Sequence, residues 1–428
     1  MIEIQTIRSN GAGVTERLRV KNFDASAIIG RLQEIDLTRR QTIKQLDDIL
    51  AESKVLARQI GELFQQGRAE EAGQLKERTA LLKQQSKELQ ESLDALTAGQ
   101  DELMVQLPNV PHPSVPAGVT PADNEIVHSE GGVPSLWDWA LPHWELAVNY
   151  GLIDFEWGNR ITGAGFPVYR GQGARLQRAL IGFFLDEAVA AGYTEYQPPL
   201  VVNEASAYAT GQLPDKDGQM YHIPLDNLYL IPTAEVPVTN FFRDTILDES
   251  QLPVRCCAYS QCFRREAGSY GKDVRGLNRL HQFDKVEIVQ VAHPARSYEV
   301  LEEMVAHVKG LLRKLELPFR VVKLCGGDMS FASAMTYDME VYSAAQQRWL
   351  EVSSVSNFET FQSNRMKLRY RNAEGKNVLA HTLNGSALAL PRIVAALLEN
   401  NQTSNGITIP KALRSYTGFD TILPEPGY

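Results

Sequence analysis

The chain has 428 residues, of which 43% are hydrophobic and 22% are charged, and its formal net charge is -9. This length allows two or three domains, and the composition is typical of a globular protein rather than a disordered or fibrous one. The first ten residues lack the apolar core of a signal peptide, and no stretch approaches the roughly 18 uninterrupted apolar residues of a membrane span. The four cysteines form neither a CxxC pair nor a disulfide-dense pattern. We therefore expect a cytoplasmic protein with reduced thiols, no membrane segment and no zinc site.

Two long segments near the N-terminus carry apolar residues at heptad spacing. One runs from Ile28 to Leu63 and the other from Leu75 to Leu107, with a polar break between them. Matched heptad runs joined by a short turn predict an antiparallel helical hairpin with arms about 55 Å long, and Asp24 is the expected N-cap of the first arm. A generic coiled coil for dimerisation is the alternative. Acidic and basic residues are nearly balanced here, so net charge does not mark the hairpin as a nucleic-acid binder.

Prolines then cluster at 108–121, which predicts an extended linker because proline cannot continue a helix. We therefore expect three parts: an N-terminal helical hairpin domain at 1–107, the linker at 108–121 and a C-terminal domain at 122–428. Beyond the linker, the best helix candidate is 173–191, stopped by Gly192 and followed by a strand that ends in prolines. A helix followed by a strand is common in α+β proteins and is weak evidence by itself.

Residues 258–290 concentrate positive charge in an otherwise acidic chain. Two alternating runs, one ending in FRRE and one beginning in FDKVE, predict two strands with one buried face. The loop between them contains Gly268, Gly271 and Lys272 and is basic. Such a loop predicts contact with phosphate, although a long hairpin with solvated charges would look similar.

Three further clusters place polar residues in apolar surroundings. IPTAEVPVTN puts Thr233 and Glu235 two residues apart at the edge of an expected strand, although Thr-x-Glu can also form a capping box or a turn. Arg392 lies near the start of an apolar helix, where it needs an anionic partner and where the helix N-terminus adds partial positive charge. A core helix with one structural ion pair is the alternative there. A third cluster, WLEVSSVSN, precedes cations that alternate along an expected strand, namely Arg365, Lys367, Arg369 and Arg371. Such a row favours either a positive face or a charge-protected edge.

The order of these clusters carries a family resemblance. FRREAG, a basic loop and RLHQFDKVE resemble motif 2 of the class II aminoacyl-tRNA synthetases, in the version of the seryl-tRNA synthetases. The helix and proline-ended strand resemble motif 1, LNGSALALPRIVAALLEN resembles motif 3, and the TAE segment resembles the loop that closes over serine. The resemblance covers essentially the whole chain. It implies an α+β fold with an antiparallel sheet flanked by helices, an N-terminal antiparallel coiled-coil hairpin, and a catalytic domain at 122–428.

The resemblance also implies a role for each motif residue. Arg264 would hold the α-phosphate of ATP, because its planar fork grips two phosphate oxygens, and Arg392 would hold the γ-phosphate, which makes both arginines catalytic. Glu351 and Ser354 would hold Mg²⁺, which prefers hard oxygen ligands and commonly takes only one or two from protein. The other implied ATP contacts are Arg265, Glu266, Phe283, Val352 and Ser353. The implied serine contacts are Thr233, Ala234, Glu235, Arg264, Glu287, Asn384 and Ser386.

The implied reaction has two steps. The serine carboxylate attacks the α-phosphate of ATP and releases pyrophosphate, and the terminal ribose hydroxyl of tRNA(Ser) then attacks the seryl carbonyl and releases AMP. Hydrogen bonds between the serine hydroxyl and the side chains of Glu287 and Ser386 would reject alanine by roughly 10⁴-fold, and threonine would be excluded by size. The resemblance further implies a homodimer and a hairpin that recognises the tRNA by shape. It leaves open whether a selenocysteine tRNA, tRNA(Sec), is also charged.

Three other interpretations remain at this point. A synthetase for threonine or proline would share the ATP residues but should differ at Thr233, at Glu287 and in the hairpin. A carrier-protein ligase of the same catalytic class makes the aminoacyl adenylate without tRNA, and the hairpin argues against it. A non-enzymatic descendant with a binding or regulatory role should lose at least one of the residues expected to bind ATP or the metal ion. All four of those weighed are present: Arg264, Glu266, Glu351 and Arg392.

Overall fold

The computed structural model describes residues 1–215, 217–266 and 275–424. The chain divides into two compact units: Met1–Arg19 with Phe23–Pro108, and Val20–Asn22 with Asn109–Tyr428. Most of the proline cluster therefore belongs to the second unit. There the Asn109 side-chain amide donates to the carbonyls of Ala332 and Phe358 at 2.9 and 2.8 Å, so this stretch is bound to the unit rather than free. Within the described residues no helix is long and apolar enough to cross a membrane.

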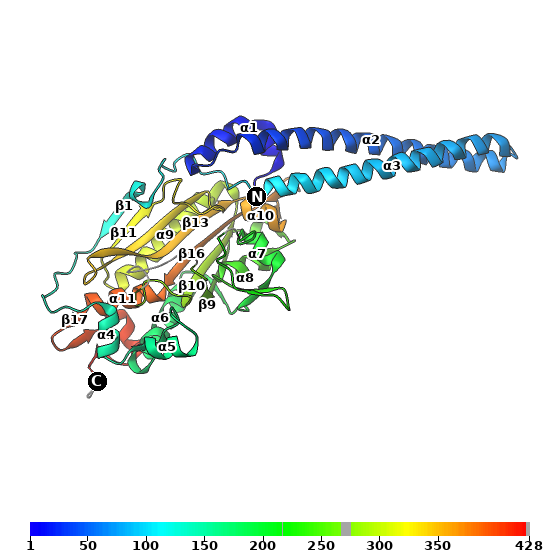
Figure 1. The fold of residues 1–428 in the computed structure, drawn as a ribbon. Coiled ribbons are helices and arrows are strands. Elements are labelled where there is room, and N and C mark those ends of the chain that lie inside the picture. The colour runs from blue at the N-terminus through cyan, green and yellow to red at the C-terminus, as the bar shows by residue number, and fades with distance from the viewer. Residues whose placement is uncertain (216, 267–274, 425–428) are drawn as a thin grey trace. The chain divides into compact units, whose positions relative to one another are not determined.

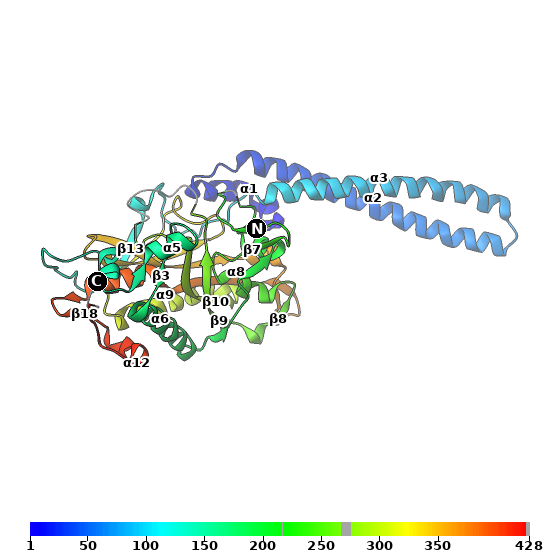
Figure 2. The same ribbon diagram turned by 60° about the horizontal axis from the view of Figure 1, so that its bottom comes forward.

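The first unit is a helical hairpin. A short helix α1 (Ile4–Leu18) precedes two long helices, α2 (Ser26–Gln65) and α3 (Ala69–Met104), which lie side by side and antiparallel in Figures 1 and 2. This confirms the hairpin predicted from the heptads. The N-cap of α2 is Ala25 and not Asp24, whose carboxylate instead accepts from the backbone N–H and hydroxyl of Ser26. Helix α2 therefore begins one residue later than predicted.

The second unit is organised around an eight-stranded sheet, and this confirms the predicted α+β class with an antiparallel sheet. The strand order is β1-β11-β12-β13-β16-β10-β9-β4, and only the β4–β9 pair is parallel. The strands are β1 (Glu125–Glu130), β4 (Thr194–Tyr196), β9 (Val254–Phe263), β10 (Gln282–Ala292), β11 (Phe319–Lys323), β12 (Met335–Ser343), β13 (Arg348–Glu359) and β16 (His381–Ala389).

Three helices pack on this sheet and bury its apolar side chains. They are α6 (Gly171–Ala190), α9 (Ser297–Lys314) and α11 (Leu390–Asn400), all visible against the sheet in Figure 1. Val286 and Ile288 of β10 belong to the core that these helices complete. Because side chains alternate along a strand, the neighbouring residues of β10 point to the other face and are free to line a site.

Shorter elements surround the sheet. The helices are α4 (His143–Asn149), α5 (Phe155–Ile161), α7 (Glu204–Thr210), α8 (Glu235–Thr239), α10 (Phe361–Met366) and α12 (Arg414–Thr417). The small sheets pair β2 (Ile153–Asp154) with β3 (Val168–Tyr169); β5 (Val201–Asn203) and β6 (His222–Ile223) with β7 (Leu228–Leu230); β8 (Ile246–Asp248) and β15 (Asn377–Leu379) with β14 (Arg369–Arg371); and β17 (Gln402–Thr403) and β19 (Thr421–Ile422) with β18 (Gly406–Thr408).

The single strand expected for the four alternating cations is wrong. Only Arg369 and Arg371 lie on a strand, while Arg365 lies in α10 and Lys367 ends that helix with φ of 57°. The Arg365 side chain is buried and donates to the carbonyls of Tyr208 and Leu213 at 2.9 and 3.0 Å. This arginine therefore holds the backbone at the end of α7 and just after it, instead of forming part of a charged strand.

Candidate active site

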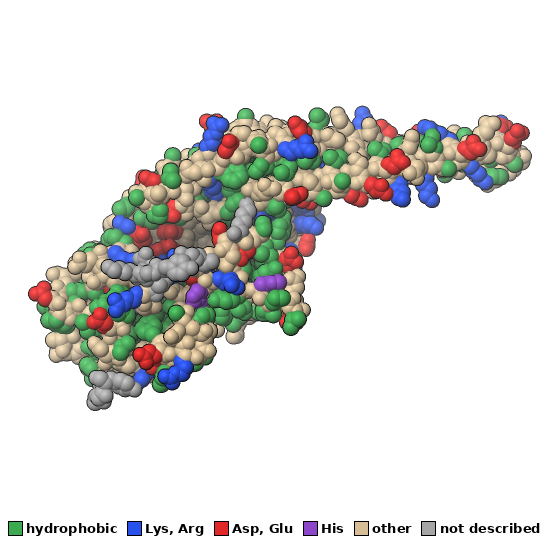
Figure 3. Space-filling view, viewed as in Figure 1, with side chains coloured by type: hydrophobic (Ala, Val, Ile, Leu, Met, Phe, Trp, Pro, Cys, Tyr) green, Lys and Arg blue, Asp and Glu red, His purple; other side chains and the backbone are tan. Residues whose placement is uncertain are grey.

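A cavity of about 530 Å³ lies in the second unit, over the face of the sheet formed by β10, β13 and β16. In Figure 3 a hollow on this unit has acidic and basic side chains beside it. The lining contains almost every residue that the motifs predicted: Thr233, Glu235, Arg264, Glu266, Phe283, Glu287, Glu351, Val352, Ser353, Ser354, Asn384, Ser386 and Arg392. Segments that are far apart in sequence therefore meet at one site.

Two arginines enter this cavity from different elements. Arg264 follows β9, and its guanidinium lies 5.3 Å from the centre of the Phe283 ring. Arg392 lies in the first turn of α11, where Nε donates to the Asn278 carbonyl at 2.9 Å and Nη1 donates to the Glu351 carbonyl at 2.7 Å. Nη1 also forms an ion pair with the half-exposed Glu351 carboxylate at 3.7 Å, so an anion that enters the cavity competes with Glu351 for the positive charge of Arg392.

Strand β10 presents alternate side chains to the cavity. Phe283 and Glu287 share a face, as their spacing predicted, and Lys285 between them lies on the same face. The buried Lys285 ammonium pairs with Glu287 and donates to the Thr233 hydroxyl at 2.8 Å, and that hydroxyl lies 3.1 Å from Glu287 Oε2. Lys285 was not among the predicted site residues, although its spacing from two of them was a signal that could have identified it.

The TAE segment does not lie on a strand as expected. Thr233 is in a loop, Glu235 begins α8, and the Glu235 backbone N–H donates to the Thr233 hydroxyl at 3.2 Å. The alternative of a local turn therefore describes the backbone, while both side chains still line the cavity. The Glu235 carboxylate accepts from Gln362 of α10 at 2.7 Å. Gln362 lies 127 residues further along the chain, and no pattern in the sequence linked the two.

The electrostatics of Glu235 follow from its burial. Removal from water, together with the nearby Glu287 carboxylate, raises the pKa of Glu235 to about 7, although Gln362, Lys285 and Asn384 oppose the shift. A carboxyl group with this pKa can be neutral in the free site and become ionised when a cation enters. The site is therefore suited to an ammonium group.

A strand irregularity brings Glu351 and Ser354 to the same cavity. Residues three apart on a regular strand point to opposite faces, yet both line it. In the pairing of β13 with β12, Ser353 faces Met339 and Glu351 faces Glu340, so Val352 is one extra residue. This bulge resets the alternation of side chains. The fit to a divalent cation is chemically sound, because a carboxylate and a hydroxyl are hard oxygen donors.

The predicted residues Ala234 and Arg265 lie outside the cavity lining. The Ala234 side chain packs in an apolar cluster, and the Arg265 guanidinium lies 5.5 Å from the centre of the Tyr221 ring. Glu266 does line the cavity and pairs with Arg279. The predicted loop residues Gly268, Gly271 and Lys272 lie outside the described residues.

The motifs predicted none of the residues that form one wall of the cavity. Ser330, Phe331 and Ala332 line it. The half-buried Lys21 side chain donates from its ammonium to the carbonyls of Ser330 and Ser333 at 2.8 and 2.6 Å. Burial lowers the pKa of Lys21 to about 7. The wall is thus held by a residue more than 300 positions earlier in the chain.

Known proteins match the chain along its whole length. A family model for the seryl-tRNA synthetase N-terminal domain matches residues 1–111, and one for the tRNA synthetase class II core domain (G, H, P, S and T) matches residues 221–401. A serine–tRNA ligase from Salinibacter ruber is 53% identical over 427 residues, covering 99% of this chain and 100% of that protein. The chain belongs to the seryl-tRNA synthetase family. A second member, from Chlorobaculum parvum, is 46% identical and covers the same shares of the two chains.

Solved structures of this family agree with the fold. Seryl-tRNA synthetase from Pyrococcus horikoshii, complexed with ATP, superposes with a TM-score of 0.93 at 31% identity and covers 100% of both chains. Cytoplasmic serine-tRNA ligase from Naegleria fowleri, in complex with AMP, has a TM-score of 0.88 at 25% identity and covers 100% of this chain and 99% of that one. A Giardia lamblia prolyl-tRNA synthetase has a TM-score of 0.56 at 17% identity, over 63% of this chain and 55% of that one, and shares the fold alone.

Proposed function

We propose how the cavity carries out the reaction of the seryl-tRNA synthetases, the ATP-dependent attachment of serine to tRNA. The observation that carries the proposal is that Arg264 and Arg392 line one cavity together with Thr233, Glu235 and Glu287. Two cations on one side can hold a triphosphate, and two buried carboxylates on the other can hold an amino acid. The substrates are thereby brought together in the orientation that the first step needs.

ATP binds along the arginine side of the cavity. Arg264 contacts the α-phosphate, Arg392 contacts the γ-phosphate, and the Phe283 ring stacks on adenine while Glu266 faces its amino group. The backbone from Val352 to Ser354 lies beside the phosphates. Arg265 serves ATP only through its backbone or by supporting Tyr221, because its guanidinium lies away from the cavity.

Glu351 and Ser354 would hold a Mg²⁺ ion when ATP is bound. In the part of the chain that the structure describes, no cluster of three His, Cys, Asp or Glu side chains could hold a metal by itself. Two protein oxygens suit Mg²⁺, which keeps waters and takes its remaining ligands from substrate phosphates. When bound, the ion neutralises charge on the phosphate oxygens.

Serine binds against Glu235, Glu287 and the β16 residues Asn384 and Ser386. Its ammonium pairs with the two carboxylates, and the segment 233–235, including Ala234, closes over it. Its hydroxyl exchanges hydrogen bonds with Glu287 and Ser386. An alanine substrate would leave these buried groups unpaired, which costs roughly 10⁴-fold in specificity.

The first step is an in-line displacement at the α-phosphate. A serine carboxylate oxygen forms the new bond to phosphorus, the bond to the β,γ-pyrophosphate breaks, and pyrophosphate leaves with the electron pair. Arg264 and Arg392 stabilise the charge that builds on the phosphate oxygens, so no covalent enzyme intermediate is needed. In the second step the terminal ribose hydroxyl of tRNA(Ser) forms an ester with the seryl carbonyl and AMP leaves. No side chain is assigned as a general base.

We assign tRNA binding to the hairpin domain at 1–107 and both chemical steps to the catalytic domain at 122–428, with 108–121 between them. The hairpin recognises tRNA(Ser) by shape, because the deep major groove of an RNA helix hides its bases from side chains. We place the protein in the cytoplasm, where its four buried, unpaired cysteines stay reduced.

We also propose that two copies form a homodimer through the region of motif 1. Apolar side chains on α5, on α6 and on β4 are exposed in the single chain, namely Trp157, Ile161, Val189 and Tyr196. Burial of such a patch against a second copy would remove apolar surface from water. Analytical ultracentrifugation tests this, and a monomer at micromolar concentration would contradict it.

ATP–pyrophosphate exchange across a panel of amino acids, followed by charging of a tRNA mixture, tests the function. We expect exchange with serine alone and charging of tRNA(Ser) alone among elongator tRNAs. Equal exchange with threonine would contradict the specificity. If no amino acid supports exchange, the proposed enzymatic activity is contradicted and a binding role is favoured.

A further inference from the structure

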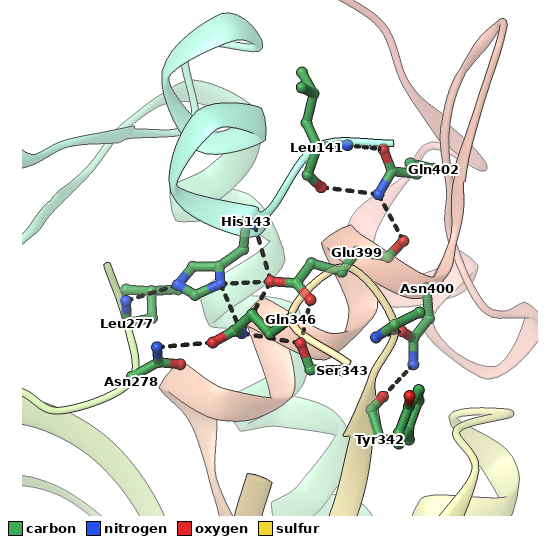
Figure 4. A network of polar contacts seen from close by, with 11 residues as sticks. Leu141, His143, Leu277, Asn278, Tyr342, Ser343, Gln346, Glu399, Asn400 and Gln402 are labelled. Carbon is green, nitrogen blue, oxygen red and sulfur yellow. Dashed lines mark hydrogen bonds and ion pairs between the residues drawn. The ribbon is translucent and has the colours of Figure 1, made fainter. Parts of the chain in front are cut away.

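A buried polar network joins helix α4 to the segment 275–280 beside the cavity (Figure 4). His143 begins α4 and Glu399 lies near the end of α11, and both side chains are 0% exposed. His143 Nδ1 lies 2.7 Å from Glu399 Oε1, and the His143 backbone N–H donates to the same oxygen at 3.0 Å. None of the functions proposed above uses this pair.

The contacts of His143 determine its protonation state. The backbone N–H of Leu277 donates to His143 Nε2 at 2.9 Å. Because an N–H group can only donate, Nε2 must carry a lone pair and the ring proton must be on Nδ1, from which it is donated to Glu399. His143 is therefore neutral and Glu399 is ionised.

The rest of the network agrees with a neutral His143 and an ionised Glu399. The side-chain nitrogen of Gln346 donates to Glu399 Oε1 at 3.0 Å and to Ser343 Oγ at 2.9 Å, while the Ser343 hydroxyl donates to Glu399 Oε2. The Gln346 side-chain oxygen accepts from the Asn278 amide at 2.9 Å. The donors of His143, Gln346 and Ser343 each face an acceptor, and Gln346 Nε2 also lies 3.4 Å from His143 Nδ1. Asn278 Oδ1 has no hydrogen-bond partner among the described residues. A buried network with its donors paired in this way favours one geometry.

Segment 275–278 is in close contact with α4. Gly276 has φ of 67°, and a Cβ placed there would lie 2.3 Å from His143 Nε2, so only glycine allows the approach. The Arg275 guanidinium lies 4.6 Å from the centre of the Trp144 ring. Three successive residues thus contact α4. The next residue, Asn278, presents its carbonyl to Arg392 Nε at 2.9 Å.

We propose that His143 is a positioning residue for ATP: its Nε2 lone pair holds the Leu277–Asn278 backbone where the Asn278 carbonyl orients Arg392. The inference rests on the proposed contact between Arg392 and the γ-phosphate. His143 itself touches no substrate. Loss of the bond from Leu277 frees the carbonyl that orients Arg392, and the loss appears in ATP binding while serine binding is unaffected.

Two substitutions separate the two bonds of His143. In His143→Asn the side-chain amide can replace Nδ1 and donate to Glu399, but it is too short to accept from Leu277. In His143→Gln the side-chain oxygen can replace Nε2 and accept from Leu277. In ATP–pyrophosphate exchange we expect H143N to raise KM for ATP by about 10-fold with an unchanged KM for serine, and H143Q to stay within about 3-fold of the parent. A purely structural role would not distinguish the two.

His381→Asn is the matched control, because His381 is another largely buried histidine, bonded through Nδ1 to Ser297 at 2.8 Å, and it does not line the cavity. We expect H381N to leave KM for ATP unchanged. Arg392→Gln is measured beside it. If R392Q leaves KM for ATP unchanged, the proposed function fails. If R392Q raises it but H143N and H143Q behave alike, the inference fails and the proposed function stands.

The double variant H143N/R392Q provides a second test. Since His143 acts through Arg392, we expect no further rise in KM for ATP beyond that of R392Q, and additive effects would overturn the inference. Should the His143 variants not fold, ¹⁵N-histidine NMR of the intact protein decides. We expect the His143 ring to be neutral with Nε2 unprotonated. A protonated Nε2 on His143 would overturn the proposal.

Discussion

The helical hairpin and the cavity differ in how far along the chain their contacting residues lie. In the hairpin, Arg78 pairs with Glu52, 26 residues away, and both are half exposed. In the cavity, Glu235 meets Gln362 across 127 residues and Arg392 meets the Asn278 carbonyl across 114. A hairpin that folds from nearby residues tolerates local change, because each turn of helix contributes a small and separate share. A cavity assembled from distant strands loses its chemistry when one contributor moves.

Deletion of residues 26–107 should have the largest effect. It removes the hairpin but keeps Val20–Asn22, which belong to the second unit. We expect tRNA charging to fall by about 10³-fold or more, the usual gap between specific and non-specific nucleic-acid binding, while ATP–pyrophosphate exchange stays nearly intact. The control is the thermal unfolding of the shortened protein. Equal loss of both activities in a folded variant would show that the hairpin is structural.

The next largest effect is expected from a comparison of two adjacent arginines, one that lines the cavity and one that does not. Arg264→Gln should lower kcat of ATP–pyrophosphate exchange by roughly 10²- to 10³-fold, because it removes one preorganised donor to the reacting phosphate. Arg265→Gln should cost under about 3-fold, because its guanidinium lies over Tyr221 and outside the lining. Steady-state kinetics of both variants test this. Similar losses in the two would indicate that Arg265 also binds ATP.

The pH dependence of serine binding should give an intermediate effect. Burial and Glu287 raise the pKa of Glu235 to about 7, so the carboxylate that attracts the serine ammonium is lost as pH falls through that value. We expect KM for serine to rise by about 10-fold from pH 8 to pH 6. In the free protein the sign for stability is opposite, since a raised carboxyl pKa makes the fold less stable as pH rises from about 4.5 to 7.

Glu235→Gln is the control for this titration, with Lys285 and Glu287 left in place. Its KM for serine should be high and should not change between pH 6 and 8. The comparison contradicts the assignment if the parent protein shows a flat profile, or if the variant keeps the slope of the parent.

The smallest effect is expected on the hairpin surface. Glu52→Gln breaks the exposed pair with Arg78 and should change the free energy of unfolding by no more than about 1 kcal/mol. Urea denaturation and tRNA charging should both resemble those of the parent. A large loss of charging without a loss of stability would instead place Glu52 or Arg78 in contact with the tRNA.

The sequence alone predicted the hairpin, the α+β class and the motif residues that line the cavity. Heptad spacing is a local property, so α2 and α3 could be predicted from neighbours three and four positions apart. The motif residues were identifiable because their order along the chain resembles the motifs of the seryl-tRNA synthetases. Phe283 and Glu287 were correctly placed on one face, since alternation along a strand is also local.

Only the tertiary structure decided the remaining features. The bulge at Val352 brings Glu351 and Ser354 to one cavity, and the register of β13 against β12 sets it. Gln362 behind Glu235, and His143 behind the segment that meets Arg392, come from other parts of the chain. Strand register and the partners of buried polar groups depend on contacts between distant residues, whose pairing no local pattern encodes.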